Sequence, residues 1–425
     1  MQDKKYSYSH LVNLLPFSQY LIAFAALIIM ATYGGMRTSF GVFFKPIMYE
    51  LGWTRALISG ASSLTLIIHG FASILSGYST DRFGARIVLT GCGIFMGTGY
   101  MLMSQLSERW HLYLFLGIVV GIGNSIQVPI LSTLVRRFPA RRGLMTGFAM
   151  AGIGVGQIII PLIATLLIYT CDWRLSYIIL GAISFLLMTG CAQFFGQMPP
   201  TTNKDCSIQT RNGSQIRIHN ELNHLSITDV IRTKEFWIIV AMQFSAAFCI
   251  QSILVHLVPY ITDVGIGSTI AAGALSVIGI AMIVGTIVLG NTADKIGEDK
   301  IYPLGFVILI ISLVGFLFSR EGWSFYLSAL CFGFAMGFPS LASVLLARIY
   351  GLKIHGTIFS ITNLSFDLGA ALSPYIFGYL YDITHSYQGA FLTDTTFALI
   401  GLILSMILIL MNPKGRVPRA EPVGE

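Results

Sequence analysis

The stretch GYSTDRFGAR at residues 77–86 decides the fold of this chain, because a second copy of it, GNTADKIG, lies at residues 290–297. The second copy begins 213 residues after the first, counted from Gly77 to Gly290. The same offset relates Gly143, Gly156 and Pro161 to Gly356, Gly369 and Pro374. A constant offset over this distance indicates that one structural unit has been duplicated, so we expect a fold of two repeats.

The composition of the whole chain indicates that lipid is its solvent. Of its 425 residues, 55% are hydrophobic and only 11% are charged, and the mean hydropathy is +0.75. Soluble domains carry about 25% charged residues. Segments of about twenty apolar residues, long enough to cross a bilayer as helices, recur along the chain. They lie at 18–44, 56–79, 87–106, 112–135, 143–169, 174–196, 236–260, 269–290, 301–319, 324–349, 356–381 and 390–411. The predicted fold is an all-α membrane protein with twelve transmembrane helices in two six-helix bundles.

One long polar stretch divides these segments into two groups of six. It covers 197–235 and is rich in Asn, Thr, Ser and charged residues. We therefore expect an N-terminal six-helix bundle at 1–196 and a C-terminal six-helix bundle at 236–411. The stretch between them is predicted to be a cytoplasmic linker, and 412–425 is predicted to be a cytoplasmic tail.

The positions of lysine and arginine predict the orientation of the helices, because basic loops stay on the cytoplasmic side. An orientation with both termini inside places 20 of the 26 basic residues on that side. These residues are Lys4, Lys5, Arg82, Arg86, Arg136, Arg137, Arg141, Arg142, Lys204, Arg211, Arg217, Arg232, Lys234, Lys295, Lys300, Arg348, Lys353, Lys414, Arg416 and Arg419. Topology thus explains the net charge of +7, and nucleic-acid binding is excluded as its cause. We expect the chain in the inner or plasma membrane.

Four tryptophans agree with this orientation. Trp53, Trp110, Trp173 and Trp323 fall at the predicted outer ends of the segments. Aromatic side chains are enriched where the membrane meets water, so we expect these four in an outer aromatic belt.

The loop signature and the two repeats resemble the major facilitator superfamily over essentially the whole chain. The pattern G-x-x-x-D-[RK]-x-G-x-[RK] is complete at 77–86, and the copy after the eighth segment is the more degenerate one. The resemblance implies transport by alternating access, usually by a monomer. It implies a gating role for Asp81, Arg82, Arg86, Asp294 and Lys295, since a carboxylate at the membrane edge can latch and release two bundles. Alternatively, the loop is only a tight turn that sets the topology.

A second resemblance is narrower. Residues 35–44 (GMRTSFGVFF) and 50–55 (ELGWTR), together with 142–147 and 256–260, are similar to monocarboxylate porters and oxalate/formate antiporters. This resemblance implies that the substrate is a small organic anion. Animal monocarboxylate porters carry an Asp/Arg pair in helix eight, whereas no charged residue lies within 269–291 of this chain. An anion is therefore expected to bind elsewhere.

Arg37 is the main candidate for anion binding. A charge at the centre of a membrane helix costs at least about 2.5–3.5 kcal/mol, so the few charges within the segments are informative. Arg37 lies in the outer half of the first segment, and Tyr33 lies one turn below it on the same face. The planar donor set of arginine suits a carboxylate. Alternatively, Arg37 reaches the outer interface or forms a structural ion pair.

Asp367 is the candidate proton carrier, because it is the only acid clearly near the middle of the membrane. It stands where the first repeat has Gly154, and Asn363 lies one turn earlier on the same face. Burial disfavours the charged form of a carboxylate, which suits reversible proton binding. The alternatives are a fixed ion pair with a basic side chain and direct contact with the substrate, for which Asn363 is also a candidate.

Histidine and amide side chains supply further candidates. His256, near the outer end of the seventh segment, can titrate near neutral pH and donate to a carboxylate, so it is predicted to bind substrate or a proton. Alternatively, it is an interfacial residue. Asn124 and Gln127 share a face of the fourth segment and are predicted to line the cavity, although such amides also join helices. His69 is assigned to packing or to a contact between the bundles.

Together these observations predict a secondary transporter that carries a small organic anion, most simply a monocarboxylate. Its partners would be protons or a counter-anion, and the lipid bilayer. The first alternative is an antiporter that exports hydrophobic drugs or metabolites and works without Arg37. The second is a nutrient sensor without flux, although the loops offer no sizeable signalling segment. The sequence contains no nucleophile–base set and no metal-ligand spacing, so we expect no enzymatic activity, metal or cofactor.

Overall fold

The computed structural model describes residues 3–53, 55–196 and 226–411. Within these ranges, all regular secondary structure is helical. Most of the predicted linker, 197–225, and the predicted tail, 412–425, lie outside the described residues. The last part of the predicted linker contains the short helix α10 (Ile227–Ile231), and the next helix begins at Lys234.

The elements of the first half form six crossings, of which the fourth is made of short pieces. In chain order they are α1 (Asp3–Leu51), α2 (Arg55–Phe83), α3 (Ala85–Leu102), η1 (Met103–Gln105), α4 (Arg109–Leu112), η2 (Tyr113–Val120), α5 (Gly121–Gly123), α6 (Gln127–Arg137), α7 (Arg142–Thr170), α8 (Trp173–Ala192) and η3 (Gln193–Gly196).

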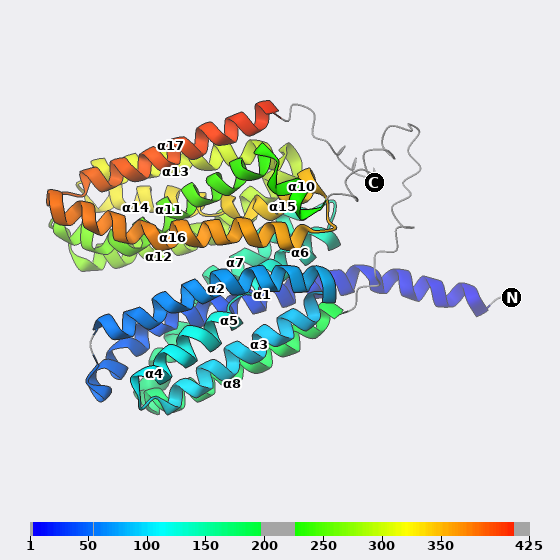
Figure 1. Ribbon diagram of the computed structural model, residues 1–425, viewed down its shortest axis with the longest axis horizontal. Coiled ribbons are helices and arrows are strands. Elements are labelled where there is room, and N and C mark those ends of the chain that lie inside the picture. The colour runs from blue at the N-terminus through cyan, green and yellow to red at the C-terminus, as the bar shows by residue number, and fades with distance from the viewer. Residues whose placement is uncertain (1–2, 54, 197–225, 412–425) are drawn as a thin grey trace.

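The elements of the second half follow α10 and make six further crossings. They are α11 (Lys234–Asp263), α12 (Ser268–Ile296), α13 (Glu298–Phe318), α14 (Gly322–Ala335), η4 (Phe338–Leu341), α15 (Ala342–Tyr350), α16 (His355–Thr384) and α17 (Gln388–Met411). In Figure 1 the first half, from blue to teal, lies below the second half, from green to red. The halves touch where α2 packs on α16 and where α7 packs on α12.

The expected all-α membrane fold with twelve transmembrane helices is confirmed. Among the described residues, eleven crossings have the length and hydropathy of a membrane-spanning helix. The twelfth is α16, which is 30 residues long and carries Asn363 and Asp367 within its length. The largest difference concerns α1, which extends beyond the predicted 18–44 at both ends. A hydropathy pattern locates the apolar part of a helix, whereas this helix continues until Gly52, whose φ of +66° ends it.

The fourth and tenth crossings are broken, although the sequence predicts continuous helices there. The fourth crossing turns at 124–126, between α5 and α6, and the tenth turns at 336–337, between α14 and η4. Pro129 follows the first turn and Pro339 follows the second. Proline lacks an N–H group, so it is tolerated in the first turn of a helix and disfavoured in its interior. These breaks were not predicted because the segments remain apolar throughout.

Glycines bring the two halves into backbone contact. Between α2 and α16, a Cβ atom on Gly77 would lie 2.4 Å from the carbonyl oxygen of Gly356. Between α7 and α12, a Cβ atom on Gly147 would lie 2.0 Å from the carbonyl oxygen of Thr286. Only glycine permits such an approach. In Figure 1 the light-orange start of α16 lies toward the end of the molecule that holds the start of α1 and the end of α17.

Candidate functional site

A cavity with a volume of about 280 Å³ lies in the first half. Its lining residues come from α1, α2, α3 and the broken fourth crossing: Tyr33, Arg37, Phe40, Ser62, Ser63, Thr65, Leu66, His69, Tyr100, Leu116 and Asn124. The described lining combines one arginine, one histidine, several hydroxyl groups and an apolar part, and it contains no carboxylate. Such a lining suits a small polar ligand.

Arg37 brings a positive charge into this cavity. Its Nη1 atom donates a hydrogen bond to the hydroxyl oxygen of the buried Tyr33, 3.3 Å away. Among the described side chains, no Asp or Glu lies within ion-pair distance of Arg37. A guanidinium has five N–H donors, so most of its donor capacity is available to a ligand. An arginine in this state can bind a carboxylate through two parallel hydrogen bonds.

His69 and Asp367 connect the cavity to the other half of the molecule. The Nδ1 atom of His69, on α2, lies 3.3 Å from Oδ2 of Asp367, on α16. The two side chains are 4% and 17% exposed. Asn363 donates from Nδ2 to the same oxygen of Asp367 at 3.3 Å. On the other side, the ring of His69 lies 6.5 Å from the ring of Tyr33. A run of polar groups thus leads from Arg37 through Tyr33 and His69 to Asp367.

Two polar atoms of the cavity residues are buried without a partner. They are Nε2 of His69 and Oδ1 of Asn124, neither of which has a hydrogen bond within the described part of the chain. An unpaired buried polar atom costs about 1–3 kcal/mol. A polar ligand in the cavity would relieve this cost, so the two atoms favour a binding role for the residues that carry them.

Two of the predicted site residues, His256 and Gln127, lie apart from both the cavity lining and the His69–Asp367 contact. The imidazole of His256, on α11, lies 3.0 Å from the carbonyl oxygen of Pro374 and stacks on Phe377. The side-chain amide of Gln127 lies 3.7 Å from the sulfur of Met150. The other candidates come together: Arg37, Tyr33 and Asn124 line the cavity, and Asp367 and Asn363 lie beside His69.

Asp81 ties the first half to the start of α16. Its carboxylate accepts hydrogen bonds from the backbone N–H groups of Gly356 (3.0 Å) and Thr357 (2.8 Å), and from the hydroxyl of Thr357 (3.0 Å). Arg136, on α6, forms an ion pair with the same carboxylate. Since the N-terminus of a helix attracts negative charge, α16 itself adds to this contact.

Asp294 makes the related contact in the second half. Its carboxylate accepts from the backbone N–H groups of Gly143 (2.7 Å) and Leu144 (2.8 Å), at the start of α7. The positive charge of Arg142, at the start of the same helix α7, also attracts this carboxylate. Both loop carboxylates therefore combine a contact to the start of a helix with the charge of an arginine, Arg136 for Asp81 and Arg142 for Asp294.

The basic residues of the two loops contact neither carboxylate. Arg82 donates to the hydroxyl oxygen of Tyr78 at 3.3 Å, and Arg86 donates to the side-chain oxygen of Gln193 at 2.8 Å. Lys295 is exposed. Within the described residues, none of these three basic side chains forms an ion pair with Asp81 or Asp294.

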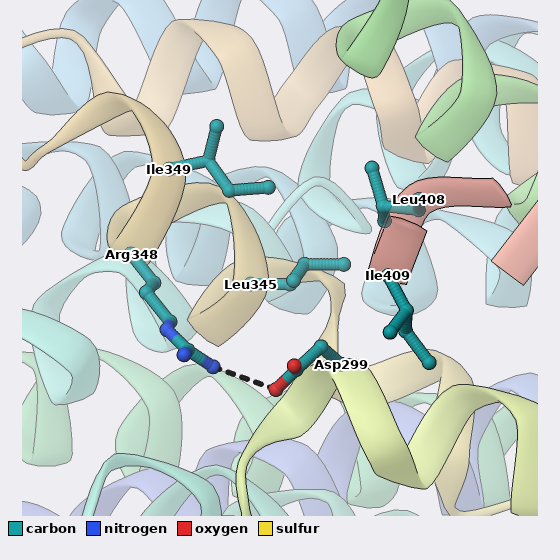
Figure 2. Close-up of a pocket in the computed structure, with 6 residues that line it drawn as sticks. All are labelled: Asp299, Leu345, Arg348, Ile349, Leu408 and Ile409. Atoms are coloured by element: carbon teal, nitrogen blue, oxygen red, sulfur yellow. Dashed lines mark hydrogen bonds and ion pairs between the residues drawn. The ribbon is translucent and has the colours of Figure 1, made fainter. Parts of the chain in front are cut away.

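Figure 2 shows a second, much smaller crevice, lined by residues of α13, α15 and α17. Arg348 points toward Asp299 across it, with 2.7 Å between Nη1 and Oδ1, and the same nitrogen lies 3.0 Å from Glu298. The volume of the crevice is about 10 Å³. This is room for about one water molecule, so the crevice is excluded as a substrate site.

The sequence analysis missed some residues of the cavity. His69, assigned there to packing or to a contact between the bundles, does connect the halves, but it also lines the cavity. Tyr100 and the hydroxyls of Ser62, Ser63 and Thr65 were not singled out. One signal was available, since Thr65 and His69 are four residues apart and therefore share a face of α2.

Asp394 is a further acid that the sequence analysis did not consider. It is fully buried in α17 and accepts a hydrogen bond from the hydroxyl of Ser252 at 2.6 Å. It lies outside the lining of the cavity. Within the described ranges, no group of three or more His, Cys, Asp or Glu side chains could hold a metal ion.

The family model described as Major Facilitator Superfamily matches residues 25–345 and 287–424 of this chain. Similar proteins include the "Uncharacterized MFS-type transporter YhjX" of Escherichia coli, which is 27% identical over 73% of this chain and 75% of its own length. Monocarboxylate transporter 13 of Rattus norvegicus is 27% identical over 90% of this chain and 87% of its own length. Monocarboxylate transporter 11 of Homo sapiens is 26% identical over 95% of this chain and 83% of its own length.

Two solved structures are similar in fold. The proton:xylose symporter XylE, bound to 6-bromo-6-deoxy-D-glucose, matches with a TM-score of 0.71 and 16% identity, covering 95% of this chain and 97% of its own. The fucose:proton symporter FucP of Escherichia coli matches with a TM-score of 0.69 and 13% identity, covering 92% of this chain and 99% of its own. At these identities the likeness concerns the fold alone.

Proposed function

We propose that this chain, which belongs to the Major Facilitator Superfamily and resembles its monocarboxylate transporters, carries a small organic anion, most simply a monocarboxylate, across the membrane by alternating access. The observation that carries this proposal is the state of Arg37. It lines a cavity of about 280 Å³, and no described carboxylate pairs with it. Keeping an arginine within a membrane helix costs free energy, which an anionic substrate would offset.

The composition of the cavity supports a substrate with one negative charge. Arg37 is its only basic residue apart from His69, within the described lining. Hydroxyl groups and Asn124 can bind polar groups of the substrate, while Phe40, Leu66 and Leu116 can cover an apolar part. Two similar proteins carry the name monocarboxylate transporter, which agrees with this substrate class.

We place the cavity in an alternating-access cycle as follows. The bundles at 1–196 and 236–411 would move relative to each other, with Asp81 and Asp294 as latches and Arg82, Arg86 and Lys295 beside them. The basic loops lie at the latched end, so this end would face the cytoplasm of an inner or plasma membrane. Transport would be coupled to protons or to a counter-anion, with Asp367 as the proton carrier, and a monomer would suffice. The contacts of His256 and Gln127 favour a structural role for both.

The test is uptake of a panel of labelled carboxylates by purified protein in liposomes, with and without an inward proton gradient. Four proteins are compared: the wild type, Arg37→Ala, Arg37→Lys and, as a matched control on an exposed helix start, Arg109→Ala. We expect saturable uptake of one acid by the wild type and the control. Arg37→Ala should lose it, and Arg37→Lys should raise KM about tenfold, because lysine keeps the charge without the planar donor pair.

Two outcomes of this uptake experiment would contradict the proposal. Full uptake by Arg37→Ala would show that the anion does not bind at Arg37. Failure of every carboxylate, combined with proton-dependent movement of hydrophobic cations or neutral drugs, would replace the proposal with export of hydrophobic compounds.

A further inference from the structure

We propose that His355 makes the closed end of this protein, where Asp81 and Asp294 join the halves, sensitive to pH: the end closes only around a neutral imidazole, so acid on this side favours its opening. The inference concerns the regulation of the transport cycle and not the carried anion. It rests on the proposed alternating access, because it requires a state in which this end is open. Since the basic loops lie here, the controlling pH would be that of the cytoplasm.

His355 stands directly beside the contact that closes the two halves. It is the first residue of α16, and only 1% of its surface is exposed. The next two residues, Gly356 and Thr357, donate their backbone N–H groups to Asp81 of the first half. A Cβ atom on Gly356 would lie 2.8 Å from the carbonyl oxygen of Gly77. Separation of the halves at this end therefore changes the surroundings of His355.

The hydrogen bonds of the imidazole suit its neutral form. Nε2 lies 2.6 Å from the backbone carbonyl oxygen of Ser343 on α15. A carbonyl oxygen only accepts, so Nε2 carries the hydrogen of the neutral ring. Nδ1 is buried and has no hydrogen-bond partner among the described residues. A second proton would make Nδ1 a charged N–H group without an acceptor, which is costly in a buried place.

The charges around the ring also oppose a second proton. Three charged side chains act on His355, and all of them belong to the first half: Asp81 on α2, Arg136 on α6 and Arg142 at the start of α7. Two positive charges thus face one negative charge, and Arg136 already forms an ion pair with Asp81. Protonation of His355 would add a third positive charge to this group, so the closed state favours the neutral ring.

The other charged or titratable side chains on the elements around the start of α16 titrate far from neutral pH. They are Arg82 on α2, Arg137 on α6, Asp229 on α10, Lys234 and Glu235 on α11, and Arg348 and Tyr350 on α15. Arg348 is held by Glu298 and Asp299. Within the described ranges, His355 is the one histidine at the closed end, and histidine is the side chain whose ordinary pKa lies between pH 5 and 8.

The difference between the two states gives the direction of the pH effect. His355 lies at the aqueous end of α16, before the apolar segment 356–381. In the closed state, burial lowers the pKa of His355 to about 4; Arg136 and Arg142 act in the same direction, while the bond to Ser343 and the charge of Asp81 oppose it. In the open state water reaches the ring, and the ordinary pKa of about 6.5 applies. The proton therefore binds the open state preferentially, and acid shifts the equilibrium toward it.

The experiment measures the opening of this end directly and without substrate. Spin labels are attached to Ala140→Cys, in the turn between α6 and α7, and to Lys300→Cys on α13, in a background without other cysteines. Both positions are exposed, and they belong to different halves. Their distance is measured by pulsed electron paramagnetic resonance in nanodiscs at pH 7.5 and 5.5. We expect the ratio of open to closed molecules to rise about tenfold at the lower pH.

Two variants assign this response to His355. His355→Gln keeps an N–H donor for the carbonyl of Ser343, and His355→Leu keeps an apolar side chain of similar size; neither titrates. We expect the ratio in both to change less than about twofold between the two pH values. The closed distance at pH 7.5 shows that a variant is folded, and either variant suffices for the test.

The matched control is His385→Asn, at the opposite end of α16. His385 is exposed and has a φ of +50°, which asparagine tolerates. This variant should keep the tenfold response. A tenfold response in the variants of His355, or no response in the wild type, would overturn the proposal. Failure of the anion carrier is a separate result, because it is a loss of carboxylate uptake and leaves the substrate-free distances unchanged.

Discussion

The contact of α2 with α16 and the contact of α7 with α12 occupy equivalent places in the duplicated fold, yet their chemistry differs. By the offset of 213 residues, His69 corresponds to Met282, and Asp367 corresponds to Gly154. Met282 is buried, and a Cβ atom on Gly154 would lie 2.6 Å from Cγ1 of Ile283. The same position thus holds a polar pair in one contact and close apolar packing in the other.

At the loop ends of their helices, the α2–α16 contact and the α7–α12 contact are more alike. Each ends in a loop carboxylate bonded to the start of a helix, Asp81 to α16 and Asp294 to α7. Each contains glycines at van der Waals contact or closer. The carboxylate and the glycines are present in both contacts, whereas the His69–Asp367 pair is present in one alone and is therefore a candidate for a specific function.

The largest expected difference lies between the two loop carboxylates. Asp81→Ala leaves Arg136 without its partner and frees the donors of Gly356 and Thr357, so it should destabilise the closed end by about 3 kcal/mol. Asp294→Ala frees two backbone donors and should cost about 2 kcal/mol. The measurement is the alkylation rate of Ser360→Cys, a buried position on α16, in a background without other cysteines. A larger acceleration by Asp294→Ala would contradict the assigned roles.

A glycine substitution tests the contact between α7 and α12, which lacks a counterpart of the His69–Asp367 pair. In Gly147→Ala, the new methyl group would lie 2.0 Å from the carbonyl oxygen of Thr286, so α7 and α12 must separate. Overpacking of this kind costs about 1–3 kcal/mol. We expect slower transport and a lower unfolding temperature in detergent. Gly279→Ala on α12 is the matched control, because a Cβ atom there meets nothing within 4 Å. Equal transport rates and equal unfolding temperatures of the two variants would show that Gly147 has no special role in packing.

The polar pair can be examined by a double-mutant cycle. His69→Gln, Asp367→Asn and the double variant are compared through their unfolding free energies in detergent. Because the two side chains contact each other, the coupling energy should be about 1 kcal/mol, within the range of about 0.5–3 kcal/mol for contacting residues. Met282→Gln with Asp367→Asn serves as the reference cycle, since these positions lie in different contacts and should be additive. A coupling near zero for the first cycle would show that the pair does not form in the membrane protein.

The smallest effect is expected at Arg82. Its side chain contacts the hydroxyl of Tyr78 and the ring of Phe83, both exposed residues at the end of α2. Arg82→Ala should change the unfolding free energy by about 0.5 kcal/mol or less. The same alkylation assay at Ser360→Cys would reveal a larger role, because a marked acceleration would mean that Arg82 takes part in the latch.

The burial of the tryptophans shows that the predicted end of a segment does not decide which side chains become buried. Trp110 and Trp323 are 59% and 65% exposed, as expected of an aromatic belt. Trp53 and Trp173 are buried instead, and Trp173 donates to Glu50 of α1 beneath Arg174. Hydropathy predicts where a helix ends, but it contains no information on which neighbouring helix will cover the residue found there.

The sequence by itself determined the helices, the duplication and the short set of charged residues inside the membrane. These properties follow from local physics: the length of apolar segments, the cost of charge in lipid, and the close approach that glycine allows. It identified Arg37, Tyr33, Asn124, Asn363 and Asp367, all of which the structure brings to the cavity or beside it.

The tertiary structure alone decided which of these residues meet. His69 and Asp367 are 298 positions apart, from residue 69 to residue 367, and no periodicity of a single helix relates them. The breaks of the fourth and tenth crossings and the placement of His256 outside the cavity lining were likewise not visible in the sequence. The reason is that contact between helices depends on how two duplicated bundles dock, whereas a sequence pattern reports the face of one helix at a time.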